Sequence, residues 1–507
     1  MIGNPLQKTE YIQCSGEEKI RIAIMYQVAS YWPTIESFYR ECVKDKEVEV
    51  RIFFVDKTSV EKAQVEGSEL FLDKENISYE TYNESAIRGF RPHVALYQPP
   101  YDVSYRNPDA LSIHLMEMGI RIVYIPYGIE IADTEDARWN HFHTFVVRNA
   151  WRIYTFSEMM KADYWKYCPN RHAVRALGIP KFDSIAYKER IAKGEIAEAA
   201  GGRQIILWKM HFPKLIYEDD CKKQVTPYME EYIKFAEKVE AYEDLFFVVM
   251  PHPMFFSQTI DGGLAEKARE LLDILGKKAN VHIDRTADYR TSLYHADAIM
   301  VDRSAIMIEA GFLDVPVLYM KNADYDEPLT EAVRTLMDSY EQGCTCEDMC
   351  NFVDAFRRKE IDCVSSRIAE VRNRILPYRI GESGRNILED IKSGVKEQEN
   401  SVIRVAFFGA GYICEHYINE LHIKNNSDFE CVSLADNDKS KWGTEKVGIP
   451  VVSPEELRNT DVDLIVISSE QYYMPIKKKL VYEWYIAEEK IIRLDQFAQM
   501  YISKYNS

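Results

Sequence analysis

Short apolar runs alternate with longer amphipathic segments along the whole chain. The runs IRIAIMY, from Ile20, and FFVVM, from Phe246, are typical of strands. The stretch TIESFYRECVKD, which follows Trp32-Pro33, has the character of an amphipathic helix instead. Because each strand is followed by a polar turn and then a helix, the pattern predicts an α/β architecture with parallel sheets.

These alternating elements divide the chain into three units. The first unit, residues 1–195, ends at a charged Gly- and Ala-rich passage, AKGEIAEAAGGRQ, and the second, residues 196–396, ends at a hydrophilic linker, KSGVKEQENS. The third unit, residues 402–507, is smaller. Two α/β units of similar size in tandem predict a ligand cleft between them, at the carboxyl ends of their strands. The strands that we predict there are 20–26, 48–55, 94–98, 121–127, 152–157, 204–209, 246–250, 281–284, 298–302 and 316–320.

Composition narrows the class of protein. The chain has 63 Lys and Arg against 81 Asp and Glu, a formal net charge of −18, so it lacks the basic excess that nucleic acid phosphates require. No apolar stretch approaches the ~20 residues that span a bilayer, and the N-terminal residues lack the apolar centre of a signal peptide. The ten Cys have no regular spacing, and their tightest cluster, GCTCEDMC, is typical of packing thiols rather than of a metal site. We therefore expect a cytoplasmic protein with no nucleic acid partner.

His252 is the first candidate for chemistry. In VVMPHPMFF it lies just beyond the predicted strand 246–250, on a turn flanked by prolines. A histidine at the carboxyl end of such a strand points into the expected cleft, where it can donate to a phosphate or move a proton near neutral pH. The alternative is a histidine that caps the strand or packs beneath its loop.

A second group of candidates follows the predicted strand 298–302. Arg303 supplies positive charge, Ser304 is a natural helix N-cap whose helix start offers free N–H groups to an anion, and Glu309 can accept hydrogen bonds from a ribose. Taken singly, Ser304 is only a helix cap and Glu309 a solvated helix residue. Together with His252, at the ends of two strands of one unit, they indicate a site for a nucleoside diphosphate.

These motifs resemble the CDP-glycerol glycerophosphotransferase family of teichoic-acid polymerases. The family has PHP after a strand and, about fifty residues later, the pattern D-x-S-x-x-x-x-[DE], which ends here at Glu309. The segment GIPKFD, which contains Lys181, resembles the family's Gly-Tyr-Pro-Arg-Asn-Asp, and ILW with His211 stands where the family has the first strand of its nucleotide-binding half. The closing ESGRNILEDI resembles the family's terminal helix, so that the resemblance covers roughly residues 20–395.

The resemblance implies the GT-B fold, two tandem Rossmann-like halves with the donor bound mainly by the second. It also implies that His252 contacts the donor pyrophosphate, that Ser304 binds phosphate and that Glu309 stands near the nucleotide. Arg303 and Lys181 complete the candidate donor-binding residues. The implied donor is a CDP-polyol, and the implied acceptor is a glycan or a lipid-linked glycan, which would fit peripheral contact with the inner face of the cell membrane. No cofactor or metal is required, because a helix dipole and basic side chains can stabilise the developing charge.

The sequence departs from this family at the expected catalytic base. The family has Trp-His-Gly-Thr after a strand of the first half, whereas this chain has Tyr127-Gly128, and a tyrosine with a pKa near 10 is a poor base at neutral pH. Ala305 replaces the second Ser of the family's Ser pair. The candidates for the base are Glu130 on the same loop, His211 from the other side of the cleft, and His141 and His143 in RWNHFHTF.

The third unit carries an incomplete dinucleotide fingerprint. Gly409-Ala410-Gly411 follows a strand and opens a helix, but Cys414 replaces the third Gly. Asp436 ends the next strand, roughly where an acid that binds a ribose would lie. Gly409, Gly411 and Asp436 are therefore candidate nucleotide-binding residues. The pattern resembles small Rossmann-like domains of sugar-modifying and capsule-synthesis enzymes, which bind nucleotide sugars or help assemble the protein.

The sequence thus favours an enzyme that transfers glycerol or ribitol phosphate from a CDP-activated donor to a glycan or lipid-linked acceptor, in bacterial cell-surface polymer synthesis. Two alternatives stay open. One is a GT-B glycosyltransferase that uses a CMP-, UDP- or GDP-sugar. The other is a degenerate nucleotide-binding scaffold, which Tyr127 and Ala305 favour.

Overall fold

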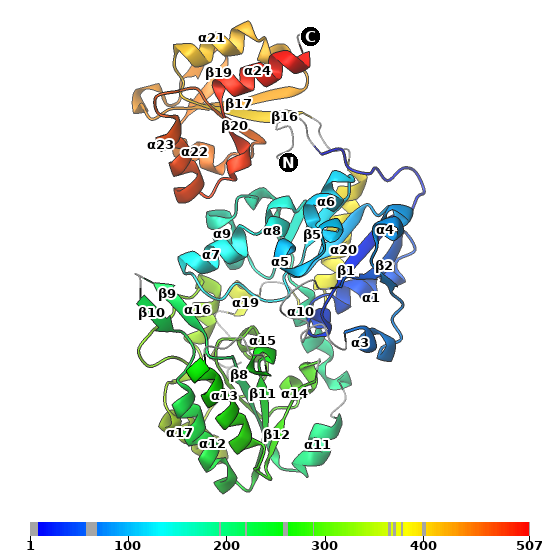
Figure 1. Ribbon diagram of the computed structural model, residues 1–507, viewed down its shortest axis with the longest axis vertical. Coiled ribbons are helices and arrows are strands. Elements are labelled where there is room, and N and C mark those ends of the chain that lie inside the picture. The colour runs from blue at the N-terminus through cyan, green and yellow to red at the C-terminus, as the bar shows by residue number, and fades with distance from the viewer. Residues whose placement is uncertain are drawn as a thin grey trace.

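The computed structural model contains three α/β units, each built on its own sheet (Figure 1). The first two units are tandem Rossmann-like halves of the GT-B type, as predicted, and the smaller third unit lies at the far side of the first (Figure 1). Residues 398–401 of the predicted linker lie outside the described residues. The structure describes residues 9–56, 68–191, 194–218, 221–256, 262–286, 288–363, 367–368, 372–376, 379–397 and 402–505.

The first sheet has seven strands in the order β3-β2-β1-β4-β5-β6-β7, and all neighbours are parallel. Every residue of β4 and β5 is buried, because helices cover both faces of a parallel sheet. The strands are β1 (Ile20–Tyr26), β2 (Val48–Phe54), β3 (Glu80–Thr81), β4 (Val94–Tyr97), β5 (Arg121–Tyr124), β6 (Arg152–Thr155) and β7 (Val174–Ala176). The helices are η1 (Ala29–Thr34), α1 (Glu36–Lys44), α3 (Ser68–Lys74), α4 (Glu84–Phe90), α5 (Asp102–Tyr105), η2 (Pro108–Ala110), α6 (Ser112–Glu117), α7 (Glu135–Phe142), α8 (Phe145–Asn149), α9 (Glu158–Tyr167), η3 (Arg171–Ala173), α10 (Pro180–Asp183) and η4 (Ser184–Arg190).

The second sheet has six parallel strands in the order β12-β11-β8-β13-β14-β15. Its strands are β8 (Gln204–Met210), β11 (Leu245–Pro251), β12 (Val281–Ile283), β13 (Ala298–Val301), β14 (Val317–Met320) and β15 (Glu341–Gly343). A separate antiparallel hairpin, β9 (Leu215–Glu218) and β10 (Cys221–Gln224), follows β8 and was not predicted from the sequence. The helices are α11 (Gly194–Ala200), which packs against β11 and α14, α12 (Met229–Lys238), η5 (Val239–Ala241), η6 (Pro253–Phe256), α13 (Gly262–Leu275), α14 (Arg290–Tyr294), α15 (Ile306–Ala310), α16 (Glu331–Met337), α17 (Cys346–Arg357), α19 (Arg372–Ile375) and α20 (Ser383–Lys396).

The third sheet has six strands in the order β18-β19-β17-β16-β20-β21, parallel except for the β18–β19 pair. Its strands are β16 (Ile403–Phe408), β17 (Phe429–Ala435), β18 (Glu445–Lys446), β19 (Ile449–Val452), β20 (Leu464–Ile467) and β21 (Ile491–Arg493). The helices are α21 (Tyr412–Glu420), η7 (Ile423–Asn425), η8 (Lys439–Lys441), α22 (Pro454–Asn459), α23 (Tyr473–Lys478), the π-helical turn η9 (Lys479–Glu483), η10 (Glu488–Lys490) and α24 (Leu494–Tyr505).

The helix α20 crosses back from the second unit to the first. It lies beside β1 and α1 (Figure 1), and four of its apolar residues join the core that β1 forms. A Cβ on Gly384 would stand 2.5 Å from the backbone of α1, so only glycine allows this close approach. The carboxylate of Asp183 accepts hydrogen bonds from the N–H groups of Gly381, Ser383 and Gly384 and thereby caps the helix. Two segments that carried the family resemblance, GIPKFD and ESGRNILEDI, therefore meet here.

The third unit packs on the first through aromatic and charged side chains. The ring of Tyr485 contacts those of Tyr167 and His143, each at a centroid distance of 5.3 Å. The buried guanidinium of Arg171 donates to the carbonyl of Trp484 at 2.6 Å, and Arg148 pairs with Glu489. His143 therefore takes part in this contact between units, outside the residues that line the cleft.

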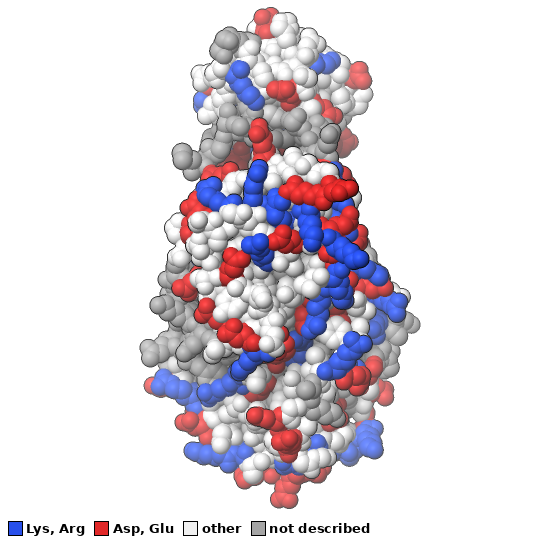
Figure 2. Space-filling view, turned by 90° about the vertical axis from the view of Figure 1, so that its right-hand side faces the viewer, with Lys and Arg blue, Asp and Glu red and all other residues white. Residues whose placement is uncertain are grey.

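Two surface properties bear on the membrane prediction. Within the residues that the structure describes, no helix combines the length and the apolar character that crossing a bilayer would need. On the face in Figure 2, Lys and Arg gather in a band on the right-hand side of the middle part, with Asp and Glu beside them. On α20, for example, Lys392 pairs with Asp45 and Glu47. Peripheral membrane contact stays a prediction.

Candidate functional site

A cavity of about 220 Å³ lies between the first two units, where the carboxyl ends of their central strands face one another. The first unit lines it from the loops after β4 and β5 and from α7. The second unit lines it from the loops after β8, β11 and β13. The lining residues are Pro100, Tyr101, Tyr124, Pro126, Tyr127, Gly128, Ile129, Glu130, Ile131, His141, His211, His252, Arg303, Ser304 and Ala305.

The loop after β5 enters the cavity because the strand stops early. We predicted strand through residue 127, but β5 ends at Tyr124. Pro126 has no N–H to donate to a sheet ladder, so the chain leaves the sheet before it. The following residues, Tyr127 to Ile131, are thereby free to form one wall of the cavity.

His252 faces the cavity as a hydrogen-bond donor. The N–H of Met254 donates to its Nδ1 at 3.1 Å, so that Nδ1 carries a lone pair and the ring proton of the neutral form is on Nε2. Burial, reinforced by the nearby charge of Lys209, lowers the pKa of His252 to about 3. At neutral pH this ring is therefore an uncharged N–H donor.

His211 has the opposite tautomer. Its Nδ1 lies 2.8 Å from the carbonyl oxygen of Phe212, which can only accept, so Nδ1 carries the proton and Nε2 the lone pair. Burial, then the neighbouring His252, lowers the pKa of His211 well below its usual value. The two imidazoles stand 4.9 Å apart between ring centroids. The pair thus combines one donor and one acceptor at the ends of adjacent strands.

A buried lysine and a buried aspartate contact the backbone next to these histidines. Lys209, near the end of β8, donates to the carbonyls of Met210 and Met250, both at 3.3 Å. Asp302 accepts from the N–H of His211 at 2.7 Å. Burial lowers the pKa of Lys209 and raises that of Asp302. Sequence analysis gave no role to Lys209 or to Asp302, although a lysine inside the apolar run QIILWKM and the Asp that opens the D-x-S pattern were usable signals.

Arg303 and Ser304 line the cavity, but their surroundings differ from the prediction. The Nε of Arg303 donates to both carboxylate oxygens of Glu327, at 2.7 and 3.0 Å, so its charge is already balanced. The N-cap of α15 is Ala305 rather than Ser304, which corrects the predicted cap. The Ser304 Oγ accepts only a long bond, 3.4 Å, from the N–H of Ile306.

Glu130 is the cavity carboxyl group best matched to proton transfer. It is buried, its carboxylate accepts a hydrogen bond from the hydroxyl of Tyr164, and its carbonyl accepts one from Thr330. Burial raises the pKa of Glu130 to about 7, and the Tyr164 hydrogen bond partly opposes that rise. A carboxyl group that titrates near neutrality can accept a proton in one step and return it in another. His141, the remaining candidate here, has a pKa lowered to about 4, by burial first and then by Arg303.

Lys181 and Glu309 are not among the residues that line the cavity. Lys181 Nζ lies 2.8 Å from Glu309 Oε1, and both side chains are buried. The hydroxyl of Tyr289 donates to the other oxygen of Glu309 at 3.0 Å. The alternative of a solvated Glu309 is therefore wrong, because the carboxylate is sealed into an ion pair between the units.

In the third unit, the Gly-rich turn and Asp436 contact each other. The Asp436 carboxylate accepts from the N–H of Ala410 at 2.9 Å and from Lys441 at 2.8 Å. Burial alone would raise the pKa of Asp436, but these hydrogen bonds lower it. Gly409 has φ 106°, whereas Gly411 is the N-cap of α21 with open space beside it. Asp436 thus holds the turn in shape, in the position where the sequence suggested a contact with ribose.

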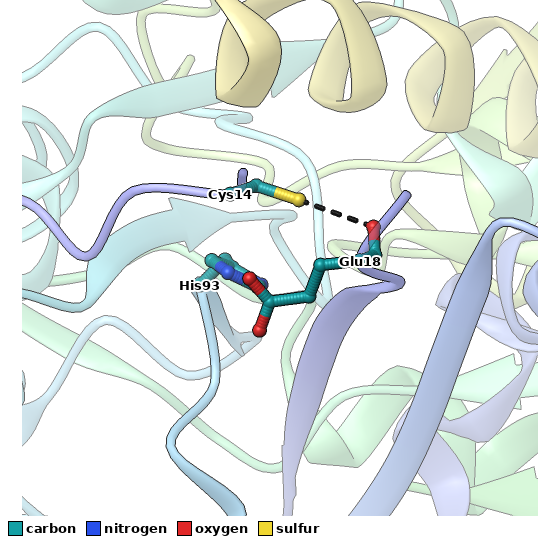
Figure 3. Close-up of side chains that lie close together, drawn as sticks. All are labelled: Cys14, Glu18 and His93. Atoms are coloured by element: carbon teal, nitrogen blue, oxygen red, sulfur yellow. Dashed lines mark hydrogen bonds between the residues drawn. The ribbon is translucent and has the colours of Figure 1, made fainter. Parts of the chain in front are cut away.

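One cluster outside the cavity has the composition of a metal site. Ligand atoms of Cys14, Glu18 and His93 lie within 4.8 Å of one another (Figure 3). However, His93 Nδ1 accepts from the N–H of Arg21 at 2.9 Å, and the guanidinium of Arg21 pairs with Glu18. The charge of Arg21 therefore stands where a cation would bind, and the cluster is explained as a structural one.

Comparisons with known proteins found a family model that matches part of the third unit and solved structures that share the fold. A family model described as C2185-like, N-terminal, matches residues 401–492, most of the third unit. No curated protein matches this chain. A UDP-N-acetylglucosamine 2-epimerase structure from Listeria monocytogenes is 15% identical, with a TM-score of 0.52, over 75% of this chain and 98% of that chain. The S. aureus MnaA structure with UDP is 14% identical, with a TM-score of 0.51, over 75% of this chain and 98% of that chain.

The wall teichoic acid polymerase TagF is also similar, at 12% identity over 76% of this chain and 90% of that chain. Its TM-score is 0.47, too low to support any conclusion. At identities this low, the likeness to the Listeria monocytogenes and S. aureus structures establishes the GT-B arrangement and nothing about the reaction.

Proposed function

We propose that this chain is an enzyme that transfers a polyol phosphate, glycerol or ribitol phosphate, from a CDP-activated donor to a hydroxyl group of a glycan or lipid-linked acceptor, in bacterial cell-surface polymer synthesis. The observation that carries the proposal is the cavity itself. It brings the neutral donor His252 from one unit opposite Glu130, a carboxyl group with a pKa of about 7, from the other.

In the proposed step, the acceptor hydroxyl oxygen attacks the phosphorus that carries the polyol. A new P–O bond forms while the anhydride P–O bond to CMP breaks, and CMP leaves with the electron pair. The Glu130 carboxylate takes the hydroxyl proton, and His252 Nε2–H donates to the oxygens on which negative charge develops. His211 Nε2, as an acceptor, orients a hydroxyl group of donor or acceptor.

A second candidate is a transferase or related enzyme that acts on a nucleotide sugar in the same cavity. MnaA, which shares the fold, was solved with UDP, and this supports a uridine nucleotide as an alternative ligand. The two candidates share the histidine pair and differ in the base of the nucleotide and in the group carried on the pyrophosphate.

Nucleotide binding separates the candidates. We would measure thermal stabilisation by CMP, CDP, CDP-glycerol, CDP-ribitol, UDP, UDP-N-acetylglucosamine and GDP, because a ligand that binds the folded state raises its stability. The proposal expects selective stabilisation by cytidine nucleotides that His252→Ala abolishes and His282→Ala, outside the cavity on β12, preserves. Selectivity for UDP or GDP would favour the second candidate, and no stabilisation by any nucleotide would reject both.

Glu130→Gln should bind nucleotide normally and lose transfer.

A further inference from the structure

Tyrosine rings form part of the first-unit wall of the cavity. Tyr127, which follows β5, stacks on Tyr31 of η1 with ring centroids 4.2 Å apart and planes 24° apart. Tyr101, which follows β4, meets Tyr127 edge-on at 6.5 Å and 62°. The hydroxyl oxygens of Tyr101 and Tyr127 lie 3.5 Å apart. Three segments of the chain thus fix the orientation of one tyrosine ring, which is half-buried at the cavity.

The two walls of the cavity differ in chemistry. Beside Tyr101 and Tyr127, the first unit contributes Pro100 and Pro126, which are also apolar rings. The second unit contributes the polar groups of His211, His252, Arg303 and Ser304, and the polar groups that the first unit adds are those of Glu130 and His141. A ligand that complements both walls has a flat apolar face on one side and hydroxyl or phosphate oxygens on the other.

A pyranose ring has that shape, and an open-chain polyol does not. The C–H groups on one face of the chair carry partial positive charge, which the negative face of an aromatic ring attracts. Glycerol and ribitol have no ring that could hold their C–H groups in one plane. The cavity, of about 220 Å³, is large enough to admit a sugar ring.

We propose that Tyr127, held by Tyr31 and Tyr101, is the platform of a pyranose-binding subsite. This subsite rests on the proposed function in one respect: the pyranose that it binds belongs to the donor or acceptor group that reacts beside the nucleotide. The assignment also gives a physical role to Tyr127, where the resembling family has a histidine. Here the loop supplies a ring face at residue 127 and a carboxyl group at Glu130, so binding and proton transfer are divided between two side chains.

Saturation-transfer NMR tests this directly. The probes are methyl β-D-glucopyranoside and methyl N-acetyl-β-D-glucosaminide, with ribitol as the open-chain comparison. Both glycosides should receive saturation from the wild-type protein and ribitol should not. Tyr127→Ala should weaken glycoside binding about tenfold, and Tyr127→Phe, which keeps the ring, should retain it. Tyr412→Ala, at a tyrosine 80% exposed in the third unit, is the matched control and should bind as the wild type does.

The proposal of a pyranose subsite is overturned if ribitol and the glycosides receive equal saturation. It is also overturned if Tyr127→Ala, with a fold confirmed by circular dichroism, binds glycosides as the wild type does. Nucleotide binding on the same samples keeps this test separate from the proposed function. Glycoside binding without nucleotide binding supports the platform and rejects the donor chemistry. A glycoside that binds alongside CDP assigns the pyranose to the acceptor, whereas displacement by UDP-N-acetylglucosamine assigns it to the sugar of a nucleotide-sugar donor.

Discussion

The ammonium of Lys181, on α10 of the first unit, and the carboxylate of Glu309, on α15 of the second, form a buried ion pair with an N–O distance of 2.8 Å. The sequence made both residues candidates for donor binding, yet in the structure the charge of each is balanced by the other. Because the pair is buried, removing one partner leaves an uncompensated charge in the protein interior.

Lys181→Met should therefore lower the free energy of unfolding by about 3–5 kcal/mol. The double variant Lys181→Met/Glu309→Met should lose much less than the sum of the single changes, since no charge is left unpaired. Urea unfolding midpoints measure the effect. Lys44→Met, at an exposed pair with Glu41, should change stability by less than about 1 kcal/mol. Equal effects of the buried and the exposed substitution would contradict the prediction.

Glu130 should make stability depend on pH. Its pKa rises from 4.5 in the unfolded chain to about 7 in the folded protein, so between these values the folded state binds more protons. The free energy of unfolding should therefore fall by up to about 3 kcal/mol as the pH rises through this window. Glu130→Gln, which cannot ionise, should abolish that part of the fall. Parallel stability curves for variant and wild type from pH 5 to 8 would disprove it.

The paired cavity histidines, His211 and His252, should stay neutral in mildly acidic solution. The pKa of His252 is lowered to about 3, by burial and then by Lys209, and proton-detected NMR of the imidazole should show its titration well below pH 5. Lys209→Met removes a neighbouring positive charge and should raise this pKa. Lys234→Met, at an exposed lysine of α12, is the control and should leave it unchanged. A midpoint near pH 6.5 for His252 in the wild type would refute the assignment.

The two glycines of the third-unit turn should respond differently to substitution. At Gly409, with φ 106°, a Cβ would collide with the Oγ of Ser468, which donates to the carbonyl of Gly409. Gly409→Ala should destabilise the third unit by about 1–3 kcal/mol. At Gly411 the space is open and φ is −107°, so Gly411→Ala should cost about 1 kcal/mol or less. Thermal unfolding of the two variants compares them, and a larger loss for Gly411→Ala would be inconsistent with this turn.

The position of the cavity followed from the sequence for a simple reason. Strand pattern is a local property, and the strand β1 was predicted with the bounds that it has in the structure, Ile20–Tyr26. Parallel strands present their carboxyl ends at the same edge, so residues predicted just after strands, such as Glu130, His211 and His252, line one cavity. No such rule predicted the hairpin β9–β10, which belongs to neither the parallel sheet nor the alternating pattern.

The amino-acid sequence by itself determined the α/β architecture, the three units and which loops face the cleft, because these depend on residue spacing along the chain. The tertiary structure alone decided the chemical state of the site. Burial sets the pKa of Glu130 and His252, backbone contacts choose the tautomers of the two histidines, and Glu327 balances Arg303. Lys181 meets Glu309, and Tyr31 meets Tyr127, across separations of many residues. Such pairings depend on distance and solvent exclusion in the folded molecule, which no local pattern encodes.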